Sequence, residues 1–290
     1  MKLVLKFNLV FIGMFLLGLL VAGMISYNLL QNNARDEIVQ NARIMMEAAL
    51  STRSYTSNQI RPLLETQMKY SFLPQSVPAY AATEYFNDLR KKYPEYSYKE
   101  ATLNPTNPRD RASDWEADLV STFRQSAQQT ELIGEREAST GRVLYLARPI
   151  QVKSEACLTC HSTVEAAPKT MIDYYGNANG FGWKLNEIIG AQIMSVPTTV
   201  PIQRAQATFK VFMASLTAVF VVIFVVLNTM LYYIVIRPVK RLSQLADQVS
   251  LGQLDVPEFT VRGRDEIGVL ADSFSRMRKS LSKAMKMLEE

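Results

Sequence analysis

The sequence has very little cysteine and histidine, the residue types that most often build metal and catalytic sites. Its 290 residues include two cysteines and one histidine, and all three lie in the segment Cys157-Leu158-Thr159-Cys160-His161. A structural zinc site needs about four such ligands, so one chain cannot form it. No second histidine is left for general base catalysis or for carrying a phosphoryl group. Since no catalytic constellation stands outside this segment, we expect that the protein is not an enzyme.

Long runs of basic residues are also absent, although the net charge is +5 and the isoelectric point is near 9.1. The charges are scattered along the chain, and those beside the two apolar runs described next serve as topology signals. The sequence therefore gives no indication that the protein binds nucleic acid.

Two long apolar runs carry no charged residue, Phe7–Leu30 and Val211–Ile236. Each exceeds the ~20 residues that a helix needs to cross a bilayer. The first is also a candidate signal peptide, because Lys2 and Lys6 precede it. Its apolar core is longer than the ~7–15 residues of a signal sequence, however, and no small-x-small cleavage site follows. We therefore interpret both runs as transmembrane helices in contact with membrane lipid.

Two membrane crossings place both chain ends on the same side. Lys2 and Lys6 precede the first run, and Arg237, Lys240 and Arg241 follow the second, which favours a cytoplasmic location for both ends. Basic residues also flank the opposite ends of the runs, so the charge bias is modest. The expected organisation is a cytoplasmic N-terminus (1–6), a first transmembrane helix (7–30), a periplasmic domain (31–210), a second transmembrane helix (211–236) and a cytoplasmic segment (237–290).

The spacing of Cys157 and Cys160 is found in thioredoxin-like redox pairs and, when histidine follows, in covalent haem attachment. A redox pair needs a βαβ context, and nothing downstream resembles a thioredoxin crossover. For haem c, two intervening residues let one short turn bring both thiols to the two vinyl groups, and the next residue lies under the ring. We therefore predict one haem c per chain, with Cys157 and Cys160 as covalent attachments and His161 as the iron ligand. Haem c is attached outside the bacterial inner membrane, which agrees with a periplasmic domain.

The sequence between the two runs predicts helices first and strands later. Apolar residues at helical spacing continue the first run outward, and a Ser-x-x-Glu capping box opens a later helix. Segments rich in β-branched and aromatic residues follow. The expected elements are a long helix over 30–70, a helix from Pro78, a helix over 113–126, and strands at 141–152 and 186–197. This order predicts an α+β, PAS-like domain rather than an all-helical cytochrome c.

Four segments of this domain resemble the c-haem PAS-like sensor domains first described in cyanobacteria. They are "FLPQSVPAYAATEYFNDLRKKYPEYSYKEATLNPTNP", "YLARPI", "CLTCHS" and "GFGWKLNEIIGAQIMSVP", in matching order over about residues 40–200. The resemblance implies an extracytoplasmic sensor whose haem is held by Cys157, Cys160 and His161. Some members supply a cysteine to the other face of the iron, and this chain has no third cysteine.

The sequence therefore does not identify the second axial ligand of the iron. We expect an open or weakly ligated position, and Met46, Tyr55 and Met68 on the long helix are the candidate ligands. Arg148, on a predicted strand, is a candidate partner for a haem propionate, since guanidinium groups bind carboxylates in a bidentate manner.

The segment after the second run resembles a HAMP domain along its whole length. Pro238 stands at the membrane exit, Gly252 ends the first helix, and residues 265–268, "DEIG", open the second. The apolar stripes are Leu242, Leu245 and Val249 in the first helix, Leu254 and Val261 in the connector, and Ile267, Leu270, Phe274, Met277, Leu281, Met285 and Leu288 in the second helix. Such heptad-like stripes need partner helices. The resemblance implies a parallel four-helix coiled coil made by two chains, hence a homodimer.

Two functions are consistent with this organisation. The first is a haem sensor of redox state or of a diatomic gas, which signals through the HAMP domain. No kinase, cyclase or methyl-accepting segment follows within 290 residues. Either the output sits on another polypeptide, for which the expected partner is a separate cytoplasmic histidine kinase or other transducer, or this chain is a sensory fragment of a larger system. The second is a membrane-anchored monohaem cytochrome c that carries electrons. A carrier has no use for a HAMP domain, and we therefore favour the sensor.

Overall fold

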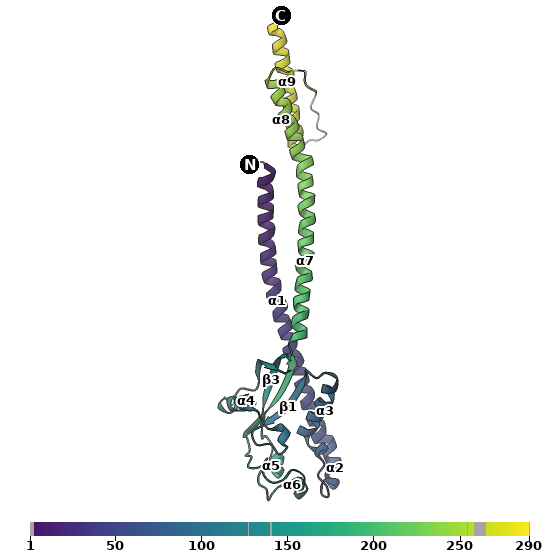
Figure 1. Ribbon diagram of the computed structural model, residues 1–290, viewed down its shortest axis with the longest axis vertical. Coiled ribbons are helices and arrows are strands. Elements are labelled where there is room, and N and C mark those ends of the chain that lie inside the picture. Colours follow the sequence, from purple (N-terminus) through teal and green to yellow (C-terminus); the bar gives the residue numbers. More distant parts are fainter. Residues whose placement is uncertain (1–2, 127, 140, 254, 258–264, 290) are drawn as a thin grey trace. The chain divides into compact units, whose positions relative to one another are not determined.

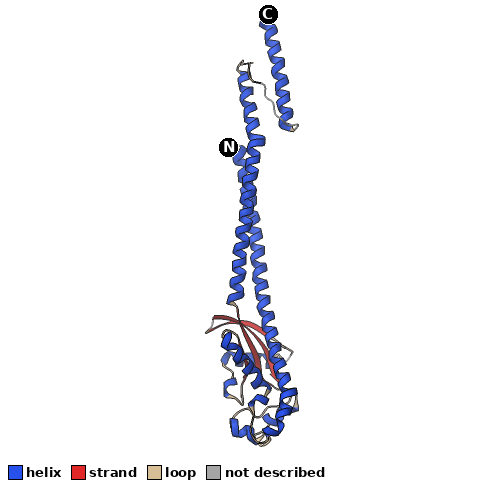
Figure 2. Cartoon of the chain, turned by 90° about the vertical axis from the view of Figure 1, so that its right-hand side faces the viewer, coloured by secondary structure: helices blue, strands red, loops and turns tan. Residues whose placement is uncertain are grey.

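The computed structural model describes residues 3–126, 128–139, 141–253, 255–257 and 265–289. The chain is organised in two units, residues 25–209 and residues 1–24 together with 210–290. Figure 1 shows the order of the elements along the chain, and Figure 2 separates the helices from the strands. The first unit contains the whole sheet, and the described part of the second unit is helical.

A long helix opens the chain, as the sequence predicts. Helix α1 covers Leu3–Tyr55, a π-helical segment η1 covers Thr56–Ile60, and helix α2 covers Arg61–Met68. The wider π turns lie directly before Pro62, which has no N–H to donate and whose ring crowds the carbonyl four residues earlier. The π segment therefore lets the helix continue past the proline without a break.

The sheet has four antiparallel strands in the order β1-β4-β3-β2. They are β1 (Ser97–Thr102), β2 (Leu132–Ala138), β3 (Gly141–Gln151) and β4 (Ile188–Pro197). Strands β3 and β4 were predicted, and they form the centre of the sheet. The edge strands β1 and β2 were not predicted, because "SYKEAT" and "LIGEREA" are rich in polar and small residues that strands seldom favour.

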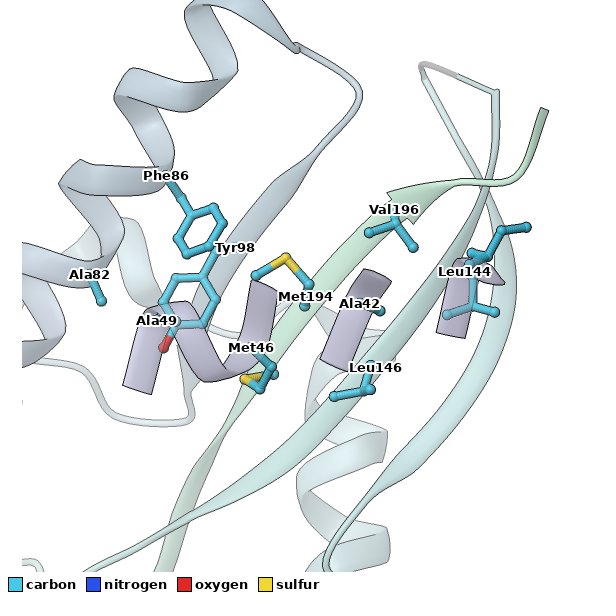
Figure 3. Close-up of a cluster of buried hydrophobic side chains, with 11 residues drawn as sticks. Ala42, Met46, Ala49, Ala82, Phe86, Tyr98, Leu144, Leu146, Met194 and Val196 are labelled. Atoms are coloured by element: carbon cyan, nitrogen blue, oxygen red, sulfur yellow. The ribbon is translucent and has the colours of Figure 1, made fainter. Parts of the chain in front are cut away.

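Helices cover both faces of the sheet, and this confirms the mixed helix-and-sheet fold class. On one face, α1 and helix α3 (Pro78–Lys92) pack on alternate residues of β3 and β4, including Leu144, Leu146 and Met194 (Figure 3). On the other face, helix α4 (Asp114–Gln125) packs on Ala147 and Ile193. The predicted capping box of α4 is present.

Short helices complete the first unit: η2 (Pro74–Ser76), η3 (Pro108–Asp110), α5 (Glu155–His161) and α6 (Lys169–Tyr175). All four lie in connections between the longer elements. Helix α5 carries both cysteines and the histidine, and the sequence had predicted only a short turn there.

The second unit contains two helices that are long and apolar enough to cross a membrane. The candidate spans lie within Val4–Met68 and Thr199–Ser250, with hydropathy values of 2.5 and 2.6. The second span comprises α7 (Thr199–Met230) and a π-helical segment η4 (Leu231–Ile236). Within this unit the Phe15 and Phe220 rings stack with their centroids 5.0 Å apart.

Two amphipathic helices follow, α8 (Arg237–Ser250) and α9 (Glu266–Glu289), and they run in the same direction in Figure 2. The predicted stripe of α8 is buried against α9, where Ala271 and Phe274 meet it. The Asp265 side chain accepts a hydrogen bond from the Gly268 N–H at 2.9 Å and so caps α9. The predicted connector anchors Leu254 and Val261 lie outside the described residues. Val256, which the sequence analysis did not single out, is a buried connector residue.

Candidate functional site

The Cys157-x-x-Cys160-His161 motif forms the single short helix α5. Ser154 caps this helix by accepting a hydrogen bond from the Ala156 N–H at 3.2 Å. The two cysteines are not bonded to each other; Cys157 is exposed and Cys160 is half-buried. Positions three apart on an α-helix face the same side. Both thiols therefore lie on one side of α5, as attachment to one porphyrin edge requires.

The His161 ring is held in a defined orientation. Its Nδ1 lies 2.7 Å from the Gly180 carbonyl oxygen, and its ring stacks on the Trp183 indole with centroids 3.9 Å apart. Burial lowers the pKa of His161, which favours the neutral imidazole. A neutral imidazole carries one N–H, and the carbonyl of Gly180 can only accept, so Nδ1 carries the proton. Nε2 then has a free lone pair, which is the arrangement that metal-binding histidines adopt.

The loop that follows α6 holds the histidine in place. The N–H groups of Gly182 and Trp183 donate to the carbonyls of Ser162 and His161, at 2.8 and 3.1 Å. Asn104 binds the other side of this loop: its side chain accepts from the Gly180 N–H at 3.3 Å. The segment around Asn104 and the segment from Gly180 to Trp183 together support the imidazole.

Gly180 is the most tightly constrained position of that support. Its φ is +89°, and a Cβ there would lie 2.0 Å from Thr106 Oγ1 and 2.9 Å from Thr106 Cα. We expect Gly180→Ala to displace the loop and its carbonyl from His161, and to lower the free energy of unfolding by about 3 kcal/mol or more, from backbone strain plus the clash. Thermal unfolding of the purified chain measures this loss.

Gly182→Ala provides the matched control. Gly182 also has a positive φ, +83°, but its Cβ would meet nothing within 4 Å. It should cost only the backbone strain, about 1–3 kcal/mol. Equal losses in both variants would show that the contact of Gly180 with Thr106 has no role in positioning the loop.

An apolar cluster adjoins the second cysteine. Phe72, Ala167 and Met171 form its buried centre. Partly buried neighbours come from α2, α5, α6 and the loops between them: Met68, Val77, Cys160, Ile172, Tyr175 and Phe181. Apolar and aromatic side chains beside a tethering thiol provide the surroundings that a porphyrin ring needs.

Two arginines face the cysteines from the long helix, and the sequence analysis missed both. Arg53 interacts electrostatically with Cys157, and Arg61 with Cys160. Burial raises the pKa of the Cys160 thiol, and Arg61 opposes that rise. They stand on either side of the π segment η1. Arg53 is already paired with the buried Glu100 carboxylate. Arg61 has no ion pair among the described residues and is suited to bind a propionate, but no local sequence signal distinguishes it from other arginines.

Arg148, the sequence-based candidate for the propionates, has other partners. Its guanidinium donates to Glu47 at 2.6 Å and to Glu131 at 3.1 and 3.2 Å. Three of its nitrogens are therefore engaged by carboxylates of α1 and of the segment before β2. The structure does not bring Arg148 together with the motif.

The three candidate axial ligands have different surroundings. Met46 is fully buried in the cluster between α1 and the sheet (Figure 3), where it packs among apolar side chains. Tyr55 is exposed. Met68 packs in the same cluster as Cys160. Among these three, Met68 is the side chain that the structure places beside the motif.

The residues around α5 fit a covalently attached haem. A free Nε2 of a neutral imidazole, two thiols on one side of a helix, an adjoining apolar cluster and the nearby Arg61 guanidinium are the chemical groups that haem c uses. Each comes from a described residue of the first unit.

Comparison with known proteins identifies the family of this chain. The family model described as Tll0287-like matches residues 31–197, and the HAMP domain model matches residues 230–283. The crystal structure of the cyanobacterial heme-protein Tll0287 is 13% identical to this chain with a TM-score of 0.44, and the match covers 56% of this chain and 95% of that chain. No curated protein matches. Since the first match spans more than half of the chain, this protein belongs to the Tll0287-like family, and it carries a HAMP domain.

Proposed function

We propose that this chain is a membrane-bound c-type haem sensor that signals through its HAMP domain to a cytoplasmic transducer. The observation that carries the proposal is the orientation of His161, whose Nδ1 is fixed by Gly180 and whose Nε2 is left for iron, next to Cys157 and Cys160. The family matched over residues 31–197 is named after a heme-protein, which supports the same cofactor.

Cys157 and Cys160 hold one haem c per chain through thioether bonds, and His161 is the proximal ligand. Arg61 would be the partner for a propionate, and Met68 is the candidate for a second iron ligand. Bound haem c supplies an iron that changes oxidation state or takes up a diatomic gas. The protein's part is to keep His161 neutral and oriented and to transmit the change to α1, which carries Arg53 and continues into the first candidate span.

The haem domain lies in the periplasm of a bacterial inner membrane. The two candidate spans put the chain ends on one side, and the basic residues beside them favour the cytoplasm for that side. Residues 237–290 and the N-terminus are then cytoplasmic.

Two chains form the signalling unit. In a single chain Met277, Leu281 and Met285 of α9 are exposed large apolar residues, and Leu288 completes the stripe in the sequence. A stripe of this kind is buried when two HAMP domains form a parallel four-helix bundle. The bundle passes the signal to a histidine kinase or similar transducer. A monohaem electron carrier, the alternative, would have no need of this bundle.

Cysteine cross-linking of α9 tests the proposal in membranes. Cys157 and Cys160 are bonded to haem and cannot form disulfides. Met277→Cys and Leu281→Cys should therefore form intersubunit disulfides, and their yield should change when the haem is reduced or exposed to NO. Such a change requires that the two haem states favour different HAMP packings.

Lys279→Cys is the control, because it lies about 200° around the helix from Met277 and should cross-link weakly in every state. If the yield of cross-links at 277 and 281 does not change with the haem state, or if no cross-link forms between subunits, the electron carrier would be favoured.

A further inference from the structure

A hollow lies in the first unit, away from the Cys157–His161 motif. Its volume is about 400 Å³, and its lining comes from α3, β1, η3, α4, β2 and β4. No residue of α5, α6 or the loop that supports His161 lines it. A volume of this size accommodates a small molecule.

Thr83 of α3 points to a ligand in this hollow. Thr83 is one of the lining residues, it is only 7% exposed, and its buried hydroxyl has no hydrogen-bond partner among the described residues. Helical threonines commonly bond the carbonyl four residues earlier. Thr52 and Thr122 do so in this chain, each at 2.9 Å. A buried hydroxyl without a partner is costly, so a polar ligand atom that accepts a hydrogen bond from the Thr83 hydroxyl would be stabilising.

Two cations of the lining are already neutralised. Lys99 forms an ion pair with Glu116 at 2.6 Å. Arg109 forms an ion pair with Glu84 and lies over the Tyr80 ring. These four charges balance one another, so the charge of the ligand is determined by the remaining cations of the lining.

Arg90 and Arg136 are those other cations. Both line the hollow, and neither forms an ion pair with a carboxylate of the described residues. The Arg136 guanidinium lies 4.2 Å from the centre of the Trp115 ring, which holds it in place by a cation–π contact. Two guanidinium groups without carboxylates therefore line one hollow from opposite elements, α3 and β2.

Asp110 is the remaining acidic group of the lining. It lies 3.8 Å from the Arg109 Nε, and burial raises its pKa to about 6. At neutral pH a carboxyl with this pKa is still mostly ionised, so Asp110 offsets one of the two guanidinium groups. The net charge of the hollow stays positive because the second guanidinium is not offset.

We propose that this hollow binds a small organic dicarboxylate. Arg90 and Arg136 pair with its two carboxylates, and the Thr83 hydroxyl donates a hydrogen bond to it. Guanidinium groups bind carboxylates through paired, charge-assisted hydrogen bonds, which gives both affinity and geometric selectivity. Such a site would give the sensor a second input besides haem. The loop that contributes Arg109 and Asp110 also contains Asn104, which binds the loop that supports His161.

Calorimetric titration of the haem-loaded full chain in detergent tests this site, with succinate as the probe. We expect saturable binding with a Kd below about 1 mM. Arg90→Met and Arg136→Met should each weaken it about tenfold or more, which is the loss expected for a hydrogen bond to a charged group. Asp110→Asn should tighten it, since it removes the one acidic group that opposes the ligand.

Two controls separate this site from nonspecific binding. Succinamide matches succinate in size but has no charge, so it should not bind. Arg142→Met removes an exposed arginine of β3 that pairs with Glu135 outside the hollow, and it should leave the affinity unchanged. The proposal is overturned if succinate and its three- and five-carbon homologues all fail to bind at about 1 mM. Equal binding of succinamide, or equal loss in Arg142→Met and Arg136→Met, overturns it as well.

Discussion

Replacing both Cys157 and Cys160 with alanine should abolish covalent haem. The chain has no other cysteine, so no other side chain can form a thioether bond to the porphyrin. His161 and the apolar cluster beside Cys160 would remain, but a coordinate bond does not survive a denaturing gel. We expect complete loss of haem-dependent peroxidase staining in the double variant, with the chain itself still present in the membrane.

His161→Ala is the matched variant, because it removes the iron ligand and keeps both thiols. It should retain staining on the gel but change the absorption spectrum of the folded protein, since the proximal ligand sets the electronic properties of the iron. The two variants therefore separate attachment from ligation. Persistent covalent haem in the double cysteine variant would refute the assignment, and so would a spectrum of His161→Ala identical to that of the unaltered protein.

The parts of the site that the sequence predicts are local. The spacing of two thiols and an imidazole is complete within five residues, and the structure realises it as one short helix, α5. The same holds for the capping box of α4 and for the β-branched strands β3 and β4. In each case the residues that determine the local conformation are neighbours in the chain.

What the sequence does not predict depends on residues far apart. The partner of His161 Nδ1 is a carbonyl 19 positions later, and a backbone carbonyl has no sequence signal. Met46 and Met68 both lie in the segment predicted as a long helix, yet one is buried between α1 and the sheet and the other packs beside Cys160. Which of them lies near the motif is decided by tertiary packing.

Strand β1 shows why a polar segment can be a strand in this fold. Its Glu100 is only 4% exposed, and a buried carboxylate needs partners that lie elsewhere in the chain. Arg53 of α1 supplies the charge, and the Tyr98 hydroxyl donates to the same carboxylate at 2.8 Å. Gln192 of β4 donates to the Tyr98 oxygen at 3.2 Å. The network connects α1 to the edge of the sheet. Arg53 also interacts electrostatically with Cys157.

Replacing Arg53 with methionine should therefore destabilise the haem domain strongly. The change keeps an aliphatic side chain on α1 but leaves the Glu100 carboxylate buried without its cation. Breaking a buried ion pair on one side costs about 3–5 kcal/mol, which corresponds to a fall of about 10 °C in the melting temperature of a domain of this size. Thermal unfolding followed by the haem absorption of the full chain measures it.

Arg43→Met is the control on the same helix. Arg43 also pairs with a glutamate, Glu131, at 2.9 Å, but its side chain is 48% exposed. Exposed pairs contribute about 0–1 kcal/mol, so this variant should unfold within a few degrees of the unaltered protein. The double variant Arg53→Met/Glu100→Gln should recover part of the loss, because the buried charge is gone and the amide still accepts from Tyr98. If Arg53→Met unfolds at the same temperature as Arg43→Met, the buried pair does not hold α1 to the sheet, and the path from the haem motif to the membrane helix must run through other contacts.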